Sequence, residues 1–285
     1  MNGLIIINKP KGYTSHDIVN KIRKVLNIKK VGHTGTLDPN ATGVLPILIG
    51  NATKISKYMV EHKKEYIAVL KLGEKTDTGD SEGNIIEKDN ELKSINITDI
   101  EEVLKSFLGK QEQIPPMYSA IKIKGKKLYE YAREGKEVEI PERQIEIYTI
   151  KLLSFNSKDE IIFKVECSKG TYIRSLCEDV AKKLDTIGYM KELKRTKVNE
   201  FTIEESLDLD KLTKQNIEKN LITIEHIFKE KEKIDLSERK LDLFLNGVQL
   251  TYELQDGLYR IYCNNIFIGL GIIKNNLLKR DIIEK

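Results

Sequence analysis

A stretch near the N-terminus combines one carboxylate with several glycines. Residues 31–50 read VGHTGTLDPNATGVLPILIG, in which Asp38 is the single acid. Pro39 moves the residue before it away from helical backbone angles, so we expect the Asp38 carboxylate on an extended loop. Residues 44–49 form an apolar run of buried-strand length that would anchor this loop. A lone acid in this setting has three interpretations: a nucleophile, a metal ligand or a turn-forming residue.

The sequence lacks the motifs of several common catalytic sites. It contains no phosphate-binding P-loop, no H-E-x-x-H zinc motif and no G-x-S-x-G elbow, and its three cysteines form no C-x-x-C pair. Counting residues does not exclude a Ser-His-Asp triad. What remains is the lone acid, tyrosines, an arginine and basic surfaces. This set fits covalent or electrostatic catalysis by a carboxylate on a polyanionic substrate.

The elements around Asp38 follow from the hydrophobic pattern. Residues 3–7 and 65–72 are predicted strands, the second with Tyr66 near its start. Ser15 is the predicted N-cap of a helix whose apolar face carries Ile18 and Ile22. A second amphipathic helix follows residue 170, and Arg174 lies on the border of its apolar face. A flanking arginine usually only extends its stem over apolar surface, unless a carboxylate meets it.

Two polar segments suggest ligand contacts. Residues 73–83 are predicted to form a long loop with three nearby acids, but the EF-hand calcium pattern fails there. We expect this loop to cover or contact a ligand. Residues 113–143 interleave lysines with tyrosines around Gly125, a composition that suits RNA, where bases stack and phosphates are neutralised. A solvated amphipathic hairpin would have a similar composition.

Composition places the chain among ordinary globular proteins. It has 285 residues, 40% hydrophobic and 32% charged, with a net charge of +4. Residues 1–64 carry a net charge of +8, which favours a polyanionic partner, although solvated helix faces would give a similar count. The cysteines are interpreted as reduced buried thiols. No targeting or membrane-spanning segment is visible, so we expect a cytoplasmic location.

The second half of the chain divides near residue 233. Residues 203–233 are predicted to be helical and charge-rich, ending in a linker. A helix over 237–245 and strands over 259–263, 266–273 and 277–283 would then form a compact β-rich domain. Two Asn-Asn pairs, at 264–265 and 275–276, are typical of hairpin turns.

The segment GHTGTLDPNATG at residues 32–43 closely resembles the signature of the TruB family, bacterial pseudouridine synthases that act on uridine 55 of tRNA. Further matching segments occur in the expected order: KPKG at 9–12, TDTGD at 76–80, PPMYSAIKIKGKKLY at 115–129, CSKGTYIR at 167–174 and LKRT at 193–196. The resemblance covers roughly residues 3–202. The C-terminal residues resemble, more weakly, the small PUA-type RNA-binding domain of such enzymes.

The resemblance implies a fold and a domain arrangement. The expected fold class is α+β, with a mixed, mostly antiparallel central sheet, flanking helices and a small β-rich C-terminal domain. The expected domains are a catalytic domain over 1–233, including an RNA-binding thumb insertion at about 113–143, and a PUA-like domain over 234–285.

The resemblance also implies an activity and its residues. The enzyme would be an isomerase that forms pseudouridine in the T-loop of tRNA after extruding the target base. Asp38 would be the nucleophile, attacking either the base or the ribose, with Tyr66 as the base for proton removal and Arg174 as the partner that keeps Asp38 ionised. Substrate binding would involve a further set of residues: His33, Lys9, Asp80, Tyr172, Leu193, Lys122 and Lys124.

No metal or organic cofactor is expected, and the expected partner is the tRNA T-arm, with no membrane, no obligate protein partner and a monomeric state. Two alternatives are kept. One is a catalytically idle protein that binds or folds RNA on the same scaffold. The other is a guide-dependent relative that works inside an RNA–protein particle, as in archaea and eukaryotes.

Overall fold

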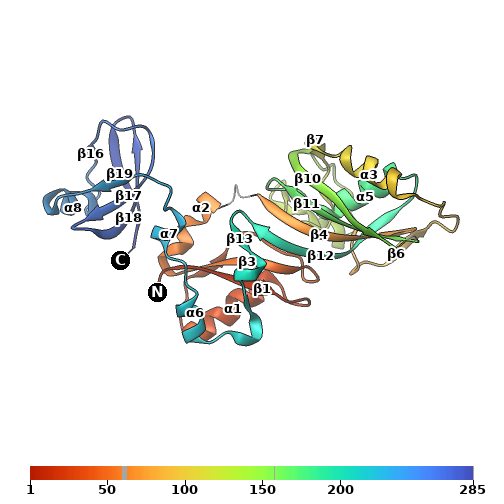
Figure 1. Cartoon of the computed structure of the whole chain (residues 1–285), viewed down its shortest axis with the longest axis horizontal. Coiled ribbons are helices and arrows are strands. Elements are labelled where there is room, and N and C mark those ends of the chain that lie inside the picture. Colours follow the sequence, from red (N-terminus) through yellow and green to blue (C-terminus); the bar gives the residue numbers. More distant parts are fainter. Residues whose placement is uncertain (60–62, 157, 285) are drawn as a thin grey trace.

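The computed structural model describes residues 1–59, 63–156 and 158–284. Within these residues the chain forms a ten-stranded sheet and, near the C-terminus, a separate five-stranded sheet (Figure 1). Further short strands form two hairpins, and helices lie against both large sheets. The fold is therefore mixed α+β, as the sequence predicts.

The large sheet runs in the order β14-β1-β3-β12-β4-β11-β10-β7, with β2 beside β3 and β13 beside β12. Among the described strands of this sheet, only the β1–β14 and β3–β12 pairs are parallel, which confirms the mostly antiparallel arrangement. Its strands are β1 Gly3–Lys9, β2 Val31–His33, β3 Thr42–Ile49, β4 Lys64–Leu72, β7 Gly109–Gln113, β10 Arg143–Phe155, β11 Glu160–Cys167, β12 Gly188–Val198, β13 Phe201–Thr202 and β14 Leu207–Asp208.

Helices bury apolar faces against this sheet. Ile18, Val19 and Ile22 of α1 join the buried side chains of β1 and β3, whereas Leu176 and Val180 of α5 pack on β4 and β11. The α-helices are α1 Ser15–Leu26, α2 Ser56–Met59, α3 Ile97–Lys105, α4 Leu128–Arg133, α5 Ile173–Lys183, α6 Lys214–Lys219, α7 Ile224–Ile227 and α8 Glu238–Leu245. Short 3-10 helices cover Gly50–Ile55, Ile203–Glu205 and Leu209–Lys211.

Two small hairpins project from the sheet. β5 (Glu74–Thr76) pairs with β6 (Ile85–Lys88), and β8 (Lys122–Ile123) pairs with β9 (Lys126–Lys127). The first hairpin corrects the prediction of a continuous loop over 73–83. The loop between β5 and β6 docks on the large sheet, where the Met190 amide donates to the Gly79 carbonyl at 3.1 Å.

The prediction of a helical segment over 203–233 was wrong. Thr213 and Thr223 each cap a separate short helix, because their hydroxyls accept hydrogen bonds from Asn216 and His226 amides. Between these helices Ile222 exchanges two 2.8 Å backbone hydrogen bonds with Leu4 of β1. The apolar residues of this segment thus wrap the sheet edge instead of lining one helix face.

The C-terminal sheet has the order β15-β17-β18-β19-β16. Its strands are β15 Lys233–Asp235, β16 Leu250–Thr251, β17 Gly257–Cys263, β18 Ile266–Lys274 and β19 Leu277–Ile283. Both residues of each Asn-Asn turn have positive φ, 51° and 61° at 264–265 and 54° and 60° at 275–276. These angles are those of tight hairpin turns, so the predicted strands and turns are confirmed.

The C-terminal sheet packs on α2 and α7, which lie between it and the large sheet (Figure 1). Leu270 and Ile282 join Met59 and Phe228 in one buried apolar cluster. The Tyr58 hydroxyl donates to Asp281 at 2.5 Å. The two sheets therefore share a core. None of the described helices is both long and apolar enough to cross a membrane.

Candidate active site

A cavity of about 480 Å³ opens beside the Asp38 loop, residues 34–41 between β2 and β3. Its walls come from distant parts of the chain, since the sheet brings β4 and β12 together beneath the loop. Segment 118–120 and Tyr129, of the insertion that follows β7, close another side. The residues that the sequence predicted at the site and that line this cavity are Asp38, Tyr66, Tyr172, Arg174 and Leu193.

The Asp38 loop is anchored on both sides of the carboxylate. Leu37 is buried, and Ser15 Oγ accepts from its amide at 2.9 Å and donates to its carbonyl at 3.2 Å. The Pro39 carbonyl accepts the Gly12 amide at 2.9 Å. Ser15 was predicted to be the helix N-cap, but Thr14 fills that position with Asp17 in a capping box. Ser15 instead holds the Asp38 loop through its two hydrogen bonds with Leu37.

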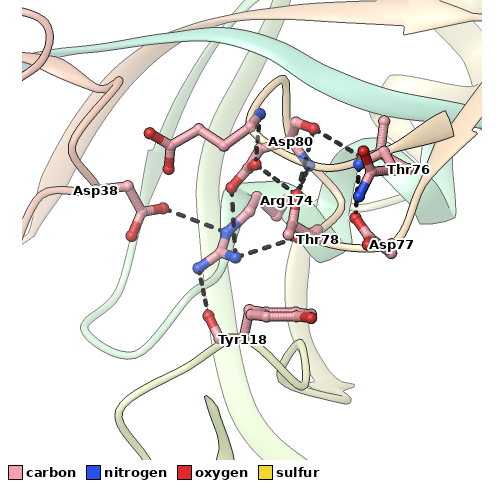
Figure 2. A network of polar contacts seen from close by, with 9 residues as sticks. Asp38, Thr76, Asp77, Thr78, Asp80, Tyr118 and Arg174 are labelled. Atoms are coloured by element: carbon pink, nitrogen blue, oxygen red, sulfur yellow. Dashed lines mark hydrogen bonds and ion pairs between the residues drawn. The ribbon is translucent and has the colours of Figure 1, made fainter. Parts of the chain in front are cut away.

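Arg174 provides the cation that Asp38 was predicted to meet. Its Nε lies 3.2 Å from Asp38 Oδ2, and its Nη1 lies 3.5 Å from Asp80 Oδ2. Nη1 and Nη2 donate to the carbonyls of Thr78 and Tyr118 at 3.2 and 3.0 Å. Figure 2 shows the guanidinium surrounded by these partners, all from other segments of the chain. Arg174 is thereby fixed in one orientation toward Asp38.

The electrostatics at Asp38 are balanced between opposing effects. Burial raises the pKa of the Asp38 carboxyl above its usual value, and the Asp80 charge adds to this rise. Arg174 lowers the same pKa, as does the Lys9 ammonium to a smaller extent. The Asp38 side chain is 37% exposed and lines the cavity, so a molecule bound there can reach the carboxylate.

Tyr66 projects from β4 into the cavity and is buried. Burial raises the pKa of its phenol to about 12, and the nearby Arg195 guanidinium opposes this rise. Proton removal by this phenolate at neutral pH would depend on further stabilisation of its charge. The Arg195 guanidinium, on β12, is a cation that acts on the Tyr66 phenol in this way.

Lys9 does not take the position that the substrate-binding prediction requires. Its side chain has no exposed surface, and its ammonium donates to the carbonyls of Pro10, Tyr13 and Pro39 at 3.1, 2.6 and 2.9 Å. Burial lowers the pKa of Lys9 to about 8. The ammonium is buried and all three of its hydrogen bonds go to carbonyls, so it does not meet a ligand in the cavity. Through the Pro39 carbonyl, Lys9 instead supports the Asp38 loop.

Asp80 is also engaged inside the protein. It is buried, accepts the Thr78 hydroxyl at 2.6 Å and the Glu82 amide at 3.0 Å, and faces Arg174. The structure therefore places it behind Arg174, where it balances the guanidinium charge.

The remaining predicted binding residues lie outside the cavity. His33 is half-buried at the end of β2, next to the cavity residue Thr34, and burial lowers the pKa of its imidazole. Lys122 and Lys124 are exposed on the β8–β9 hairpin. These three are available to a ligand that extends beyond the cavity.

Sequence reasoning missed Arg195. It appears in the sequence analysis only within the LKRT segment, with no role of its own, but in the structure it is 1% exposed and lines the cavity. The strand period contains the missing signal: Leu193 and Arg195 are two residues apart and share one face of the sheet. A residue two positions from a predicted cavity residue is expected to face the same cavity.

Comparison with known proteins identifies the family. The model of the TruB family pseudouridylate synthase N-terminal domain matches residues 23–173, and that of the tRNA pseudouridylate synthase B C-terminal domain matches residues 174–236. The chain belongs to the TruB family. The first of these matches contains Asp38, Tyr66 and the whole insertion, and the second begins at Arg174.

Relatives over the full length support this assignment. A protein of Francisella philomiragia named tRNA pseudouridine synthase B is 45% identical over 100% of this chain and 96% of its own length. One of the same name from Clostridium kluyveri is 46% identical over 96% of each. The solved structure titled "Crystal Structure of a Cbf5-Nop10-Gar1 Complex" contains a chain with a TM-score of 0.71 and 25% identity, covering 99% of this chain and 84% of that one.

Proposed function

We propose that this protein converts uridine 55 in the T-loop of tRNA to pseudouridine, with Asp38 as the catalytic nucleophile. The observation that carries the proposal is the Asp38 carboxylate, which faces a nucleotide-sized cavity and is oriented by the buried Arg174 at 3.2 Å. The membership in the TruB family and the relatives named tRNA pseudouridine synthase B supply the reaction and its substrate.

The reaction is an isomerisation. The bond between N1 of uracil and C1′ of the ribose breaks, the uracil turns, and its C5 joins C1′. The proton on C5 is then lost and N1 gains one, so no atom is added overall. Asp38 attacks either C1′ of the ribose, as N1 leaves, or the uracil ring, and it stays bonded to that fragment while the uracil turns. The bond to Asp38 breaks again as C5 joins C1′ or after it has joined, so the carboxylate is regenerated. Tyr66, on β4 in the wall of the same cavity, is the proposed base that takes the C5 proton.

The position of Asp38 at the side of a cavity requires an extruded nucleotide. A base stacked inside the T-loop presents neither C1′ nor C5 to a carboxylate, so the enzyme must flip it outward. Tyr172 and Leu193 line the cavity where the flipped base would lie. The exposed lysines Lys122 and Lys124 would hold phosphates, while His33 would contact the loop that the base has left.

The proposal treats the protein as a cytoplasmic monomer that acts without a guide RNA or an obligate protein partner. The alternative of an idle RNA-binding protein would not need a carboxylate paired with a buried arginine at a cavity. The chain's likeness to subunits of guide-dependent particles rests on the fold at 23–25% identity, against 45–46% for the named bacterial relatives.

The test is tritium release from tRNA labelled at C5 of uracil, using the purified protein alone. We expect release from a tRNA transcript, none from a transcript with cytidine at position 55, and none with the Asp38→Asn protein. Asp38→Asn retains the size of the side chain, so tRNA binding should persist. Binding of tRNA without release by the wild-type protein would support the idle alternative and refute the proposal.

A further inference from the structure

Arg195 is among the largest fully buried side chains of the described residues. Its guanidinium is surrounded by backbone carbonyls and a phenol: Nε donates to the Val44 carbonyl at 2.7 Å, and Nη2 and Nη1 donate to those of Gly35 and Thr36 at 3.2 and 3.4 Å. A buried charge held by neutral dipoles is costly, since desolvation is not repaid by a full opposite charge. The burial of the Arg195 charge therefore does not by itself account for stability, and its contacts point to another role.

These contacts bracket the Asp38 loop. Gly35 and Thr36 precede Asp38, whereas Val44 follows it. The backbone of Arg195 adds a further restraint, because it pairs in register with Gly43 where β3 and β12 run parallel. Gly43 has φ of 101°, and a Cβ there would lie 2.1 Å from the Arg195 carbonyl oxygen. One residue of β12 thus fixes the beginning and the end of the loop.

The same guanidinium also faces the Tyr66 phenol from β12, the strand next to β4. Arg195 and Tyr66 are register partners of the β4–β12 pair, so their side chains share one face of the sheet. Both line the cavity. Among the groups acting on the Tyr66 hydroxyl, which also include Cys167 and Asp38, Arg195 is the cation.

We propose that Arg195 is a positioning residue of the active site, which holds the Asp38 loop and the Tyr66 hydroxyl in a fixed mutual arrangement. The proposal rests on the proposed function for its catalytic consequence. Arg174 orients the Asp38 carboxylate itself, whereas Arg195 sets the loop from which that carboxylate projects. The guanidinium fork suits this role, because its donors reach three carbonyls at once.

The first measurement is hydrogen exchange of the amides of residues 34–41 in the whole protein, without RNA. We expect Arg195→Met to accelerate exchange there by about tenfold or more, since the loop loses the hydrogen bonds to Gly35 and Thr36 and the start of β3 loses the one to Val44. Arg195→Lys should fall between Arg195→Met and wild type. The matched control is Lys194→Met, which removes the same charge at the adjacent, exposed position of β12 and should leave exchange unchanged.

The second measurement is the single-turnover rate of tritium release at saturating protein, together with the dissociation constant for tRNA. Arg195→Met should slow turnover by about 10- to 100-fold, because small displacements of catalytic groups have effects of this size. The dissociation constant should change little. In a Tyr66→Phe background the additional loss caused by Arg195→Met should shrink, since part of its action passes through the hydroxyl.

Unchanged loop exchange and turnover in Arg195→Met would overturn the proposal, as would uniformly faster exchange across the whole protein, which marks a purely structural role. If Arg195→Met does not fold, Arg195→Lys decides by the same criteria. An inactive wild-type protein would refute the proposed function alone, because the exchange of residues 34–41 tests the positioning role without RNA.

Discussion

At the scale of single residues, the site depends on an opposition at Asp38. Burial and the neighbouring Asp80 favour the neutral acid, whereas Arg174 favours the carboxylate. The proposed nucleophile must be charged, yet a carboxylate whose charge is fully compensated by cations is a weak nucleophile. Arg174 contacts Asp38 through Nε, and its other nitrogens bind carbonyls and Asp80. It therefore favours the charged carboxylate without fully compensating its charge.

This opposition predicts a pH effect in the Arg174→Met protein. In the proposed mechanism Asp38 acts as a carboxylate, so the single-turnover rate should fall as pH falls through its pKa, which already lies above the usual value. Removing Arg174 removes the cation that lowers this pKa. The acid limb of the rate profile should therefore move to higher pH, and the rate at its plateau should also fall. Measuring release from about pH 5 to pH 9 tests this.

The control for this profile is Lys182→Met, which removes an exposed cation from the same helix, α5. Its acid limb should coincide with that of the wild type. An Arg174→Met limb at the wild-type position would mean that Arg174 contributes only orientation, and that burial and the other neighbouring charges set the pKa of Asp38.

At the scale of elements, adjacent residues at the start of α1 have different tasks. Thr14 caps the helix and forms a capping box with Asp17. Ser15 turns inward and exchanges two hydrogen bonds with Leu37, next to Asp38. The start of α1 and the Asp38 loop are thus joined through one hydroxyl.

The two positions should therefore separate stability from catalysis. Thr14→Ala should lower the free energy of unfolding by about 1 kcal/mol and leave turnover at saturating tRNA unchanged. Ser15→Ala should slow single turnover by about tenfold, because the loop loses an anchor beside the nucleophile. Urea unfolding and tritium release on both proteins provide the comparison. Equal turnover in the two variants would contradict the role of Ser15.

The insertion between β7 and β10 combines a polar tip with a contribution to the site. Its β8–β9 hairpin exposes Lys122 and Lys124, whereas Tyr118 meets Arg174 through its carbonyl and Tyr129 lines the cavity. RNA bound at the tip would therefore lie next to the segment that orients Arg174.

Charge removal at the tip should weaken binding without altering chemistry. The double variant Lys122→Gln/Lys124→Gln should raise the dissociation constant for tRNA and reduce its log–log salt slope by about 2, as two phosphate contacts are lost. The rate at saturating protein should stay near wild type. Lys93→Gln/Lys105→Gln, which changes two exposed lysines before and in α3, is the matched control. An unchanged salt slope would refute phosphate binding by the hairpin.

The sequence predicted those elements whose signals are local. The strand periods, the apolar face of α5 and the two Asn-Asn turns were sufficient because each depends on neighbours in the chain. The segment over 203–233 was misjudged because pairing with β1 decided its structure. Lys9 and Arg195 were misplaced for a related reason: only the tertiary fold surrounds a lysine or arginine with enough carbonyls to bury it.

At the scale of the whole molecule, the C-terminal sheet shares an apolar core with the large sheet. Leu270 and Ile282 are buried against Met59, Phe228 and neighbouring apolar side chains. The chain termini lie close together at this junction (Figure 1), where the Asn2 side chain donates to the Glu284 carbonyl at 2.6 Å. An interface of this kind transmits unfolding from one sheet to the other.

This shared core predicts that the two sheets unfold together. Leu270→Ala should lower the free energy of unfolding by about 2–5 kcal/mol, the usual range for a large-to-small change at a buried site. Leu270 belongs to the same apolar cluster as residues of the large sheet, so we expect one unfolding transition, shifted as a whole. Calorimetry and the loss of tritium release on heating should both report this transition. Leu277→Ala, at an exposed position of β19, should change little. The contrary result would be two separate transitions, of which Leu270→Ala shifts only the first and tritium release persists through it. The C-terminal sheet would then fold independently, and the apolar junction would not couple the two sheets.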